Sequence, residues 1–328
     1  MSRRPTGKRS SASDPRASAH ALSHSDSSGA IEPIGGGGAS KRGASAPAPG
    51  LYVTATPIGN AADITLRARA VLGAVDVIAC EDTRVTGKLL KMHGISAQLT
   101  PYHEHNAERV RPRLIARLEE GAAVALVSDA GTPLVSDPGY RLVRECIAKG
   151  IPVTALPGPS ASLAALVVSG LPTDRFLFAG FLPSRDAARR GALAALAHVP
   201  ATLVMLESPH RLAASLAAMA DVLGDRDAAV ARELTKLYEE VRRGTLSELA
   251  AHYAAAATPK GEIVVVVGPP LAAPAPEADA LDGALRAALA TMSLRDAAAH
   301  VAAETGAARG KVYARALALR RTGGGPDS

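Results

Sequence analysis

Short apolar runs alternate with longer amphipathic segments along most of this chain. Four runs in the first half have the length of buried strands: residues 51–55, 75–79, 123–128 and 153–156. Segments with apolar positions at helical spacing separate them: residues 63–73, 83–93, 106–120 and 138–149. Asp63 is the expected N-cap of the first helix. The alternation is typical of βαβ units and predicts a largely parallel sheet with helices on its faces.

The same alternation continues after residue 157. Further strands are expected near residues 176–181, 202–206, 228–232 and 263–267, with helices near 160–169, 185–197, 209–223 and 247–257. An Ala/Pro-rich stretch at 271–277 reads as a linker, and residues 280–290, 294–305 and 311–320 again show helical patterns. We therefore expect two α/β domains, residues 51–156 and 157–270, followed by a small helical domain at 277–321.

Residues 1–50 differ in composition from the rest of the chain. Ser, Gly, Pro and Ala supply 33 of these positions and aromatic residues none, so the segment is predicted to be a disordered tail. It carries seven Lys/Arg and three Asp/Glu, a net charge of +4 out of the chain's +6. The basic balance of the whole chain is therefore weak evidence for a nucleic-acid partner.

The remaining composition indicates a cytoplasmic protein. The chain has two cysteines, Cys80 and Cys146, with neither a CxxC pair nor a disulfide framework. No segment reaches the ~18 uninterrupted apolar residues of a membrane span. Aromatic residues make up only 3% of the chain, so the cores must be built from Ala, Val and Leu.

Three Gly/Pro-containing loops follow predicted strands directly. They are residues 56–60 (TPIGN), 128–133 (SDAGTP) and 157–162 (PGPSAS). Open α/β sheets bind ligands just outside the carboxyl ends of their strands, where backbone N–H groups and glycines converge. The loops therefore predict one crevice for a small ligand, although each glycine or proline taken alone reads as an ordinary turn.

Several common ligand and catalytic motifs do not fit these loops. The first lacks GxGxxG, the second lacks the Lys of a phosphate loop, and Ser162 replaces the last Gly of a nucleophile elbow around Ser160. Residues 103–105 (HEH) have metal-ligand character, but a third spaced His/Cys cluster is missing, so no metal is expected. The residues alone leave the ligand unnamed.

The motifs in their order resemble those of the tetrapyrrole-methylase-like, S-adenosylmethionine-dependent methyltransferases. The resemblance spans about residues 51–321 and rests on residues 55–60 (ATPIGN), 80–84 (CEDTR), 128–133, 136–139 (SDPG), 157–161 and 207–211 (ESPHR). Within that family, the chain is similar to the members that methylate the ribose 2′-oxygen of a cytidine in small-subunit (16S) ribosomal RNA. The fold implied is two α/β domains with a cofactor cleft between them and a small C-terminal helical appendix.

The resemblance implies S-adenosylmethionine as cofactor and names residues that would hold it. The cofactor-binding candidates are Pro57, Asp129, Gly131, Thr132, Ser160, Ala161, Met205 and Leu206. A carboxylate such as Asp129 accepts hydrogen bonds from ribose or amino groups, and small residues let the backbone approach the cofactor. The implied partner is small-subunit ribosomal RNA, within the assembled subunit, and the implied oligomer is a homodimer.

Methyl transfer to a hydroxyl needs a general base and a hold on the RNA. Base candidates are Glu81, Glu207 and His210, with His103 and Glu104 also in reach. Candidates for contacting RNA are Arg84, Lys88, His103, Arg211 and Lys236, although each alone also reads as an ordinary surface group. Asp82 reads equally well as a structural helix cap. The last helical pattern gathers Arg309, Lys311, Arg315, Arg320 and Arg321, and predicts a contact with nucleic acid or a dimer support.

Two other functions stay open at this point. One keeps the methyltransferase but changes the acceptor to a precorrin-type tetrapyrrole. The other is a non-catalytic RNA-binding protein whose basic tail and C-terminal helices dominate, and whose RNA affinity would depend strongly on salt.

Overall fold

A computed structural model describes residues 46–135, 139–270, 278–307 and 309–323. The linker expected at 271–277, the SDPG motif except Gly139, and residues 1–45 of the expected tail lie outside the described residues. The first strand already begins at Gly50. Within the described residues, no helix combines the length and hydrophobicity that crossing a membrane requires.

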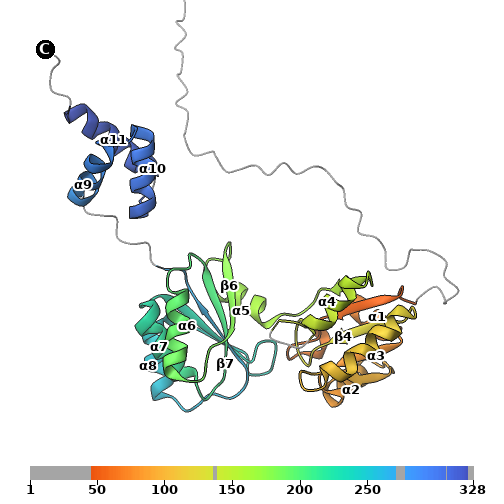
Figure 1. The fold of residues 1–328 in the computed structure, drawn as a ribbon. Helices are drawn as coiled ribbons and strands as arrows, with labels where there is room; N and C mark the ends of the chain where they lie inside the picture. Colours follow the sequence, from red (N-terminus) through yellow and green to blue (C-terminus); the bar gives the residue numbers. More distant parts are fainter. Residues whose placement is uncertain (1–45, 136–138, 271–277, 308, 324–328) are drawn as a thin grey trace, which may run out of the picture. The chain divides into compact units, whose positions relative to one another are not determined.

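The first sheet is parallel throughout, as the βαβ pattern predicts. Its order is β3-β2-β4-β1-β5. The strands are β1 (Gly50–Thr54), β2 (Val77–Cys80), β3 (Leu99–Pro101), β4 (Ala123–Val127) and β5 (Val153–Leu156). The helices between them are α1 (Leu66–Leu72), α2 (Thr83–Met92), α3 (Ala107–Glu119) and α4 (Tyr140–Ala148) (Figure 1).

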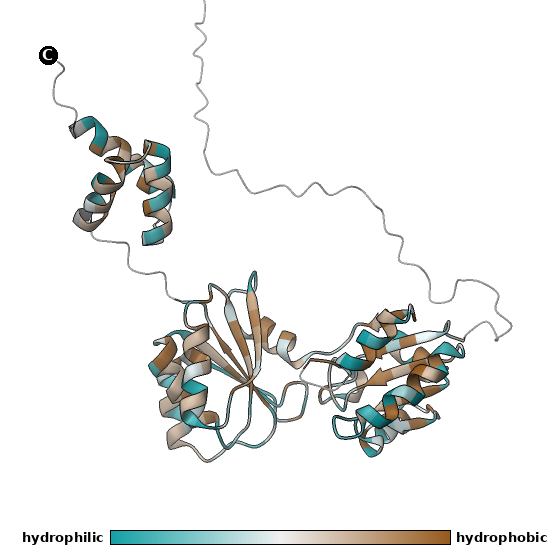
Figure 2. Ribbon diagram, in the orientation of Figure 1, coloured by the Kyte–Doolittle hydropathy of each residue, from teal (hydrophilic) through white to brown (hydrophobic). Residues whose placement is uncertain are grey.

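Alternating side chains of central strand β4 enter two separate cores. Val124 and Leu126 pack in a core with residues of α3 and α4, whereas Ala125 and Val127 pack with residues of α1 and α2. Figure 2 shows hydrophobic residues along the strands. Because helices cover both faces of the sheet, every residue of β4 is apolar.

The first helix begins later than expected. Asn60 caps a 3-10 turn, Ala61–Asp63, and Thr65 is the N-cap of α1, accepting a hydrogen bond from the Ala68 amide. The expectation that Asp63 caps this helix is therefore wrong. Asp63 and Thr65 are both common capping residues, and the one that directly precedes α1, Thr65, is the cap.

The second sheet mixes strand directions. Its order is β6-β7-β10-β8-β9; β6 and β7 run parallel, and the other neighbours are antiparallel. The strands are β6 (Phe176–Phe181), β7 (Thr202–Glu207), β8 (Asp227–Arg232), β9 (Glu240–Thr245) and β10 (Ile263–Val267). Strands β3 and β9 were not expected from the sequence.

Helices cover the two faces of this sheet unequally. Helices α6 (Asp186–Leu196), α7 (Leu212–Leu223) and α8 (Leu246–Ala255) form the larger core on one face. Helix α5 (Ala161–Ser169) packs on the other face, where Ile58 of the first loop joins the same core. The side chain of Met205 enters the larger core and its neighbour Leu206 faces the α5 side, as strand alternation requires.

The C-terminal helices form a separate small core. They are α9 (Ala278–Leu289), α10 (Leu294–Thr305) and α11 (Arg309–Gly323), packed around Leu285, Val301 and Val312. Arg315 of α11 donates two hydrogen bonds to Asp282 of α9, at 2.7 and 2.6 Å. This bidentate pair fixes the last helix against the first.

Candidate functional site

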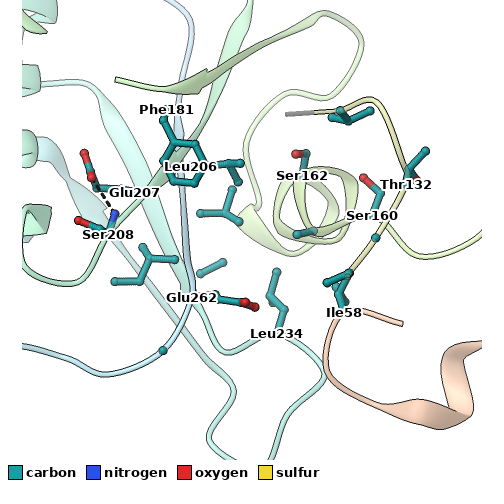
Figure 3. A pocket seen from close by; sticks show the side chains of 18 of the residues that line it. Ile58, Thr132, Ser160, Ser162, Phe181, Leu206, Glu207, Ser208, Leu234 and Glu262 are labelled. Atoms are coloured by element: carbon teal, nitrogen blue, oxygen red, sulfur yellow. Dashed lines mark hydrogen bonds between the residues drawn. The ribbon is translucent and has the colours of Figure 1, made fainter. Parts of the chain in front are cut away.

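A cavity of about 530 Å³ is lined by residues of both sheets (Figure 3). From the first sheet and its loops come Ile58, Glu81, residues 129–132 and Val135, and from the start of α5 come residues 160–162. The predicted site residues among them are Glu81, Asp129, Gly131, Thr132, Ser160 and Ala161. The loops after β1, β4 and β5 thus meet as expected, because the carboxyl ends of parallel strands share one edge.

Hydrogen bonds join the first two loops directly. Thr56 and Gly131 exchange two backbone hydrogen bonds of 2.9 and 3.0 Å, and the Thr56 hydroxyl donates to the Ser128 carbonyl. Gly131 has a φ of +80°, and a Cβ there would lie 3.4 Å from the Ile58 side chain. The left-handed backbone therefore favours glycine here, and the Ile58 side chain packs directly against it.

The third loop is fixed in turn to the second. The Thr132 hydroxyl donates to the Pro159 carbonyl at 3.1 Å. Ser160 is the N-cap of α5 and accepts a long hydrogen bond from the Leu163 amide. The first turn of α5 therefore meets the cavity with its backbone donors and two hydroxyl groups, those of Ser160 and Ser162.

Two carboxylates lie at the first-sheet side of the cavity. Asp129 accepts a hydrogen bond from the Asp82 amide at 3.0 Å, which ties the loop after β4 to the loop after β2. Glu81, half-buried, precedes that amide. The pKa of Glu81 is raised, mainly by burial and also by the nearby Asp129 carboxylate; His103 offsets part of this rise. A carboxylate with a raised pKa is a better proton acceptor than an ordinary one.

The second sheet contributes a largely apolar wall. Its members are Phe178, Phe181, Leu206, Ala231, Leu234, Ile263 and Val264, joined by Glu207, Ser208, Pro209, Gly261 and Glu262. Of these residues, Leu206 and Glu207 were predicted site residues, and Ser208 and Pro209 belong to the 207–211 motif; the others were not predicted. Two of the chain's three Phe residues lie close together on one strand, and this could have indicated an apolar wall. The residues of β8 and β10 could not be predicted, because their register in the sheet does not follow from the sequence.

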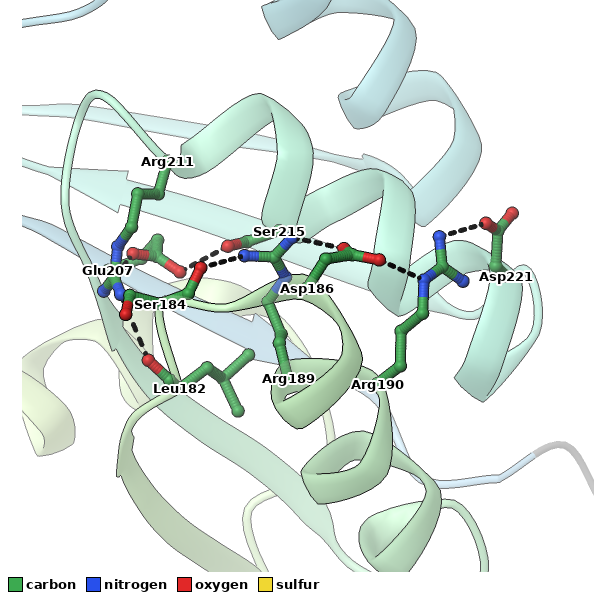
Figure 4. A network of polar contacts seen from close by, with 9 residues as sticks. All are labelled: Leu182, Ser184, Asp186, Arg189, Arg190, Glu207, Arg211, Ser215 and Asp221. Atoms are coloured by element: carbon green, nitrogen blue, oxygen red, sulfur yellow. Dashed lines mark hydrogen bonds and ion pairs between the residues drawn. The ribbon is translucent and has the colours of Figure 1, made fainter.

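Glu207 lies at the cavity but is fully engaged by neighbours (Figure 4). Its side chain is 1% exposed and accepts hydrogen bonds from the Ser208 amide (2.7 Å) and the Ser215 hydroxyl (2.5 Å). The Arg211 guanidinium pairs with it at 2.7 Å and also donates to the Leu182 carbonyl at 3.2 Å. We name Glu207, Arg211 and Ser215 the β7 clamp, because they tie the end of β7 to the start of α7 and to the segment after β6.

Other predicted site residues do not line the cavity. Pro57 is buried in the first loop, and the Met205 side chain lies in the core beneath the sheet. His103 follows β3 near Glu81, and His210 is exposed in the turn before α7. Met205 thus offers only its backbone to a ligand.

The predicted RNA contacts fall into two groups. Arg84 and Lys88 are exposed one turn apart on α2, and Arg84 pairs with Asp82, holding the pKa of that helix-capping carboxyl at about 2. Arg211 is committed to the β7 clamp. Lys236 pairs with Glu233 at 2.7 Å and Glu262 at 3.1 Å. The side chains of Arg211 and Lys236 are only 27% and 28% exposed, whereas that of Arg84 is 89% exposed despite its pairing, so Arg84 and Lys88 are the accessible pair.

The cavity fits the cofactor implied by the sequence motifs. Its volume is in the usual range for small-ligand sites of ~300–1,000 Å³. An apolar wall suits a purine ring, hydroxyl and carboxylate groups suit a ribose, and acidic residues suit a positively charged sulfur and amine. Among the described residues, no group of three or more His, Cys, Asp and Glu residues is arranged to hold a metal ion.

This fold and this cavity define a methylase class. Residues 50–250 match the model of the family Tetrapyrrole (Corrin/Porphyrin) Methylases, and residues 274–320 match the model described as RsmI C-terminal HTH domain. The first match covers more than half of the chain, so the chain belongs to the tetrapyrrole methylase family. This confirms the resemblance, the α/β fold class and the expected S-adenosylmethionine-dependent methyltransferase.

Individual relatives are more specific. A Mesorhizobium japonicum protein named Ribosomal RNA small subunit methyltransferase I is 58% identical over 280 residues, covering 85% of this chain and 95% of its own. An Erythrobacter litoralis protein of the same name is 55% identical over 272 residues, covering 83% and 96%. A crystal structure of diphthine synthase matches with a TM-score of 0.53 at 18% identity, covering 66% and 89%, and supports the fold alone.

The β7 clamp predicts that loss of Arg211 destabilises the protein more than loss of an exposed ion-paired arginine. Arg211→Met leaves the buried Glu207 carboxylate without its cation, so we expect the free energy of unfolding to fall by about 3 kcal/mol. Arg190→Met is the matched control: Arg190 pairs with Asp186 and Asp221 at an exposed site and should cost less than about 1 kcal/mol. Urea denaturation measures both, and equal losses would contradict the structural role of the clamp.

Proposed function

We propose that this chain transfers a methyl group from S-adenosylmethionine to the ribose 2′-oxygen of a cytidine in small-subunit ribosomal RNA. The observation that carries the proposal is the cavity, in which three strand-end loops with carboxylate and hydroxyl groups face an apolar wall. The relatives' shared name supports the substrate. We further propose that the chain acts in the cytoplasm on the assembled small subunit.

The proposed cofactor contacts follow the two sides of the cavity. Asp129 accepts from ribose or amino groups, Gly131 lets the backbone approach, and the hydroxyl groups of Thr132 and Ser160 add donors. Ala161 and Leu206 contact the cofactor through small or apolar surfaces. Pro57 and Met205 act through their backbones, because their side chains are buried.

Glu81 is the proposed general base. Of the three candidates, Glu207 has both carboxylate oxygens occupied in the β7 clamp, and His210 is exposed outside the cavity lining. Glu81 lines the cavity and has a raised pKa. When bound, S-adenosylmethionine supplies an electrophilic methyl group on a positively charged sulfur. Glu81 would accept the proton of the 2′-hydroxyl as that oxygen attacks the methyl group, and the proton would rest on the Glu81 carboxylate.

Exposed cations provide a hold on the RNA backbone. Arg84 and Lys88 lie on α2, the helix that follows Glu81. On α11, Arg309, Lys311, Arg320 and Arg321 are exposed, and no acidic residue interrupts the helix between Arg309 and Arg321. Such contacts position an RNA without reading its sequence. A precorrin-type tetrapyrrole would leave this basic helix without a role.

A change at Asp129 tests the cofactor site. Asp129→Asn keeps an oxygen to accept from the Asp82 amide but removes the negative charge, so we expect S-adenosylmethionine to bind about tenfold more weakly in calorimetric titration. Glu119→Gln, an exposed carboxylate paired with Lys149, serves as control and should bind normally. Tight binding by Asp129→Asn, or no heat even with the wild-type protein, would contradict the proposed site.

A change at Glu81 tests the base. Glu81→Gln should lower kcat for labelling of under-methylated small subunits by about 10²–10⁴-fold while cofactor binding persists. Because the base acts when deprotonated and its pKa is raised, the wild-type rate should fall with decreasing pH at a pH above the ordinary Glu pKa of ~4.3. A variant rate within threefold of wild type at every pH would exclude Glu81 as the base.

A homodimer is also proposed, with α5 as part of the contact. Apart from Ser162 and Ser169 every residue of this helix is apolar, yet Leu163 is 49% and Val167 71% exposed. Val167→Asp should convert a dimer to a monomer in size-exclusion chromatography with light scattering. Leu66→Asp, at a similarly exposed position on α1, should leave the dimer intact. A dimeric Val167→Asp protein would remove α5 from the contact.

A further inference from the structure

The loop between β8 and β9, residues 233–239, holds two large apolar side chains in solvent. Leu237 is 88% and Tyr238 70% exposed, although aromatic residues make up only 3% of the chain. The same loop begins at the cavity, because Leu234 is buried and lines it. An exposed Leu-Tyr pair therefore lies within four residues of the cavity wall.

The loop is held in one conformation at a cost in backbone strain. Glu233 and Thr235 have φ values of +51° and +65°, a left-handed region that non-glycine residues rarely adopt. Lys236 stabilises this strained conformation by pairing with Glu233 and Glu262. The Thr235 amide also donates a hydrogen bond to the Glu239 carboxylate at 2.6 Å. The charges of this loop thus serve to fix its shape.

Two glycines let the loop pack tightly beside the cavity. A Cβ on Gly59, in the first predicted cofactor loop, would lie 2.4 Å from Lys236 Cγ. A Cβ on Gly261 would lie 2.2 Å from the Glu233 carboxyl carbon. A side chain at either glycine would have to displace Lys236 or Glu233, so the loop packs closely against the proposed cofactor loop and the cavity rim. Strained, tightly braced segments of this kind gather at functional sites.

We propose that Tyr238 stacks on an unpaired RNA base next to the ribose in the cavity, with Leu237 packing beside it. The inference rests on the proposed function, since an RNA strand that places one ribose in the cavity brings its neighbouring nucleotides to the rim. Proteins bind unpaired RNA bases by stacking them on aromatic side chains. A loop already fixed in shape loses little conformational entropy when it does so.

The chain lacks tryptophan, which makes a direct test possible. Tyr238→Trp introduces a single tryptophan at the loop tip, and base stacking should quench its fluorescence when a cytidine-containing single-stranded RNA oligonucleotide is added. S-adenosylmethionine alone should not quench it. Tyr140→Trp, at a 64% exposed tyrosine on α4, is the matched control and should stay unquenched.

Binding of the same RNA to further variants gives the magnitude. Tyr238→Ala should weaken RNA binding about 5- to 100-fold, Tyr238→Phe should stay within twofold of wild type, and both should bind S-adenosylmethionine normally. The inference is overturned if Tyr238→Ala binds RNA like wild type, if the fluorescence of the Tyr238→Trp variant does not respond to RNA, or if Tyr238→Ala instead dissociates a dimer. Labelling of small subunits by the wild-type protein reports separately on the proposed function.

Discussion

The parallel arrangement of the first sheet is the constraint on which the site depends. In the order β3-β2-β4-β1-β5, every strand ends at the same edge, so loops far apart in the chain meet there. Glu81 follows β2, Asp129 follows β4 and Ser160 follows β5. The exchange of hydrogen bonds between Thr56 and Gly131, and the bond from Asp82 to Asp129, hold these loops together.

The charged residues around the cavity divide by their partners. Glu207 with Arg211, and Lys236 with Glu233 and Glu262, are satisfied within the protein and fix the shapes of the segments around the second sheet. Glu81 has no such cation bonded to it within the described residues, and burial raises its pKa. The same residue type thus serves as a structural element where a guanidinium pairs with it, whereas an unpaired, partly buried carboxylate is the one for which we propose proton transfer.

Much of this organisation could be predicted from the sequence. Strand–loop–helix order and Gly/Pro punctuation indicated the first sheet and the crevice, because both are local signals. The ion-pair partners of Arg211 and Lys236 could not be predicted, because they are brought together only by folding. In the sequence, a free basic residue and a paired one look the same. Strand β9 was missed because EVRRGT lacks a strong apolar alternation. The antiparallel pairs of the mixed second sheet were missed because pairing is decided by register between distant segments.

The most direct test of the central claim is a map of ribose methylation in small-subunit ribosomal RNA. Mass spectrometry would compare cells that contain this protein with cells that lack it and with cells complemented by the wild-type gene. The account predicts that one 2′-O-methylcytidine disappears without the protein and returns on complementation. An unchanged set of ribose methylations in cells that lack the protein would contradict it.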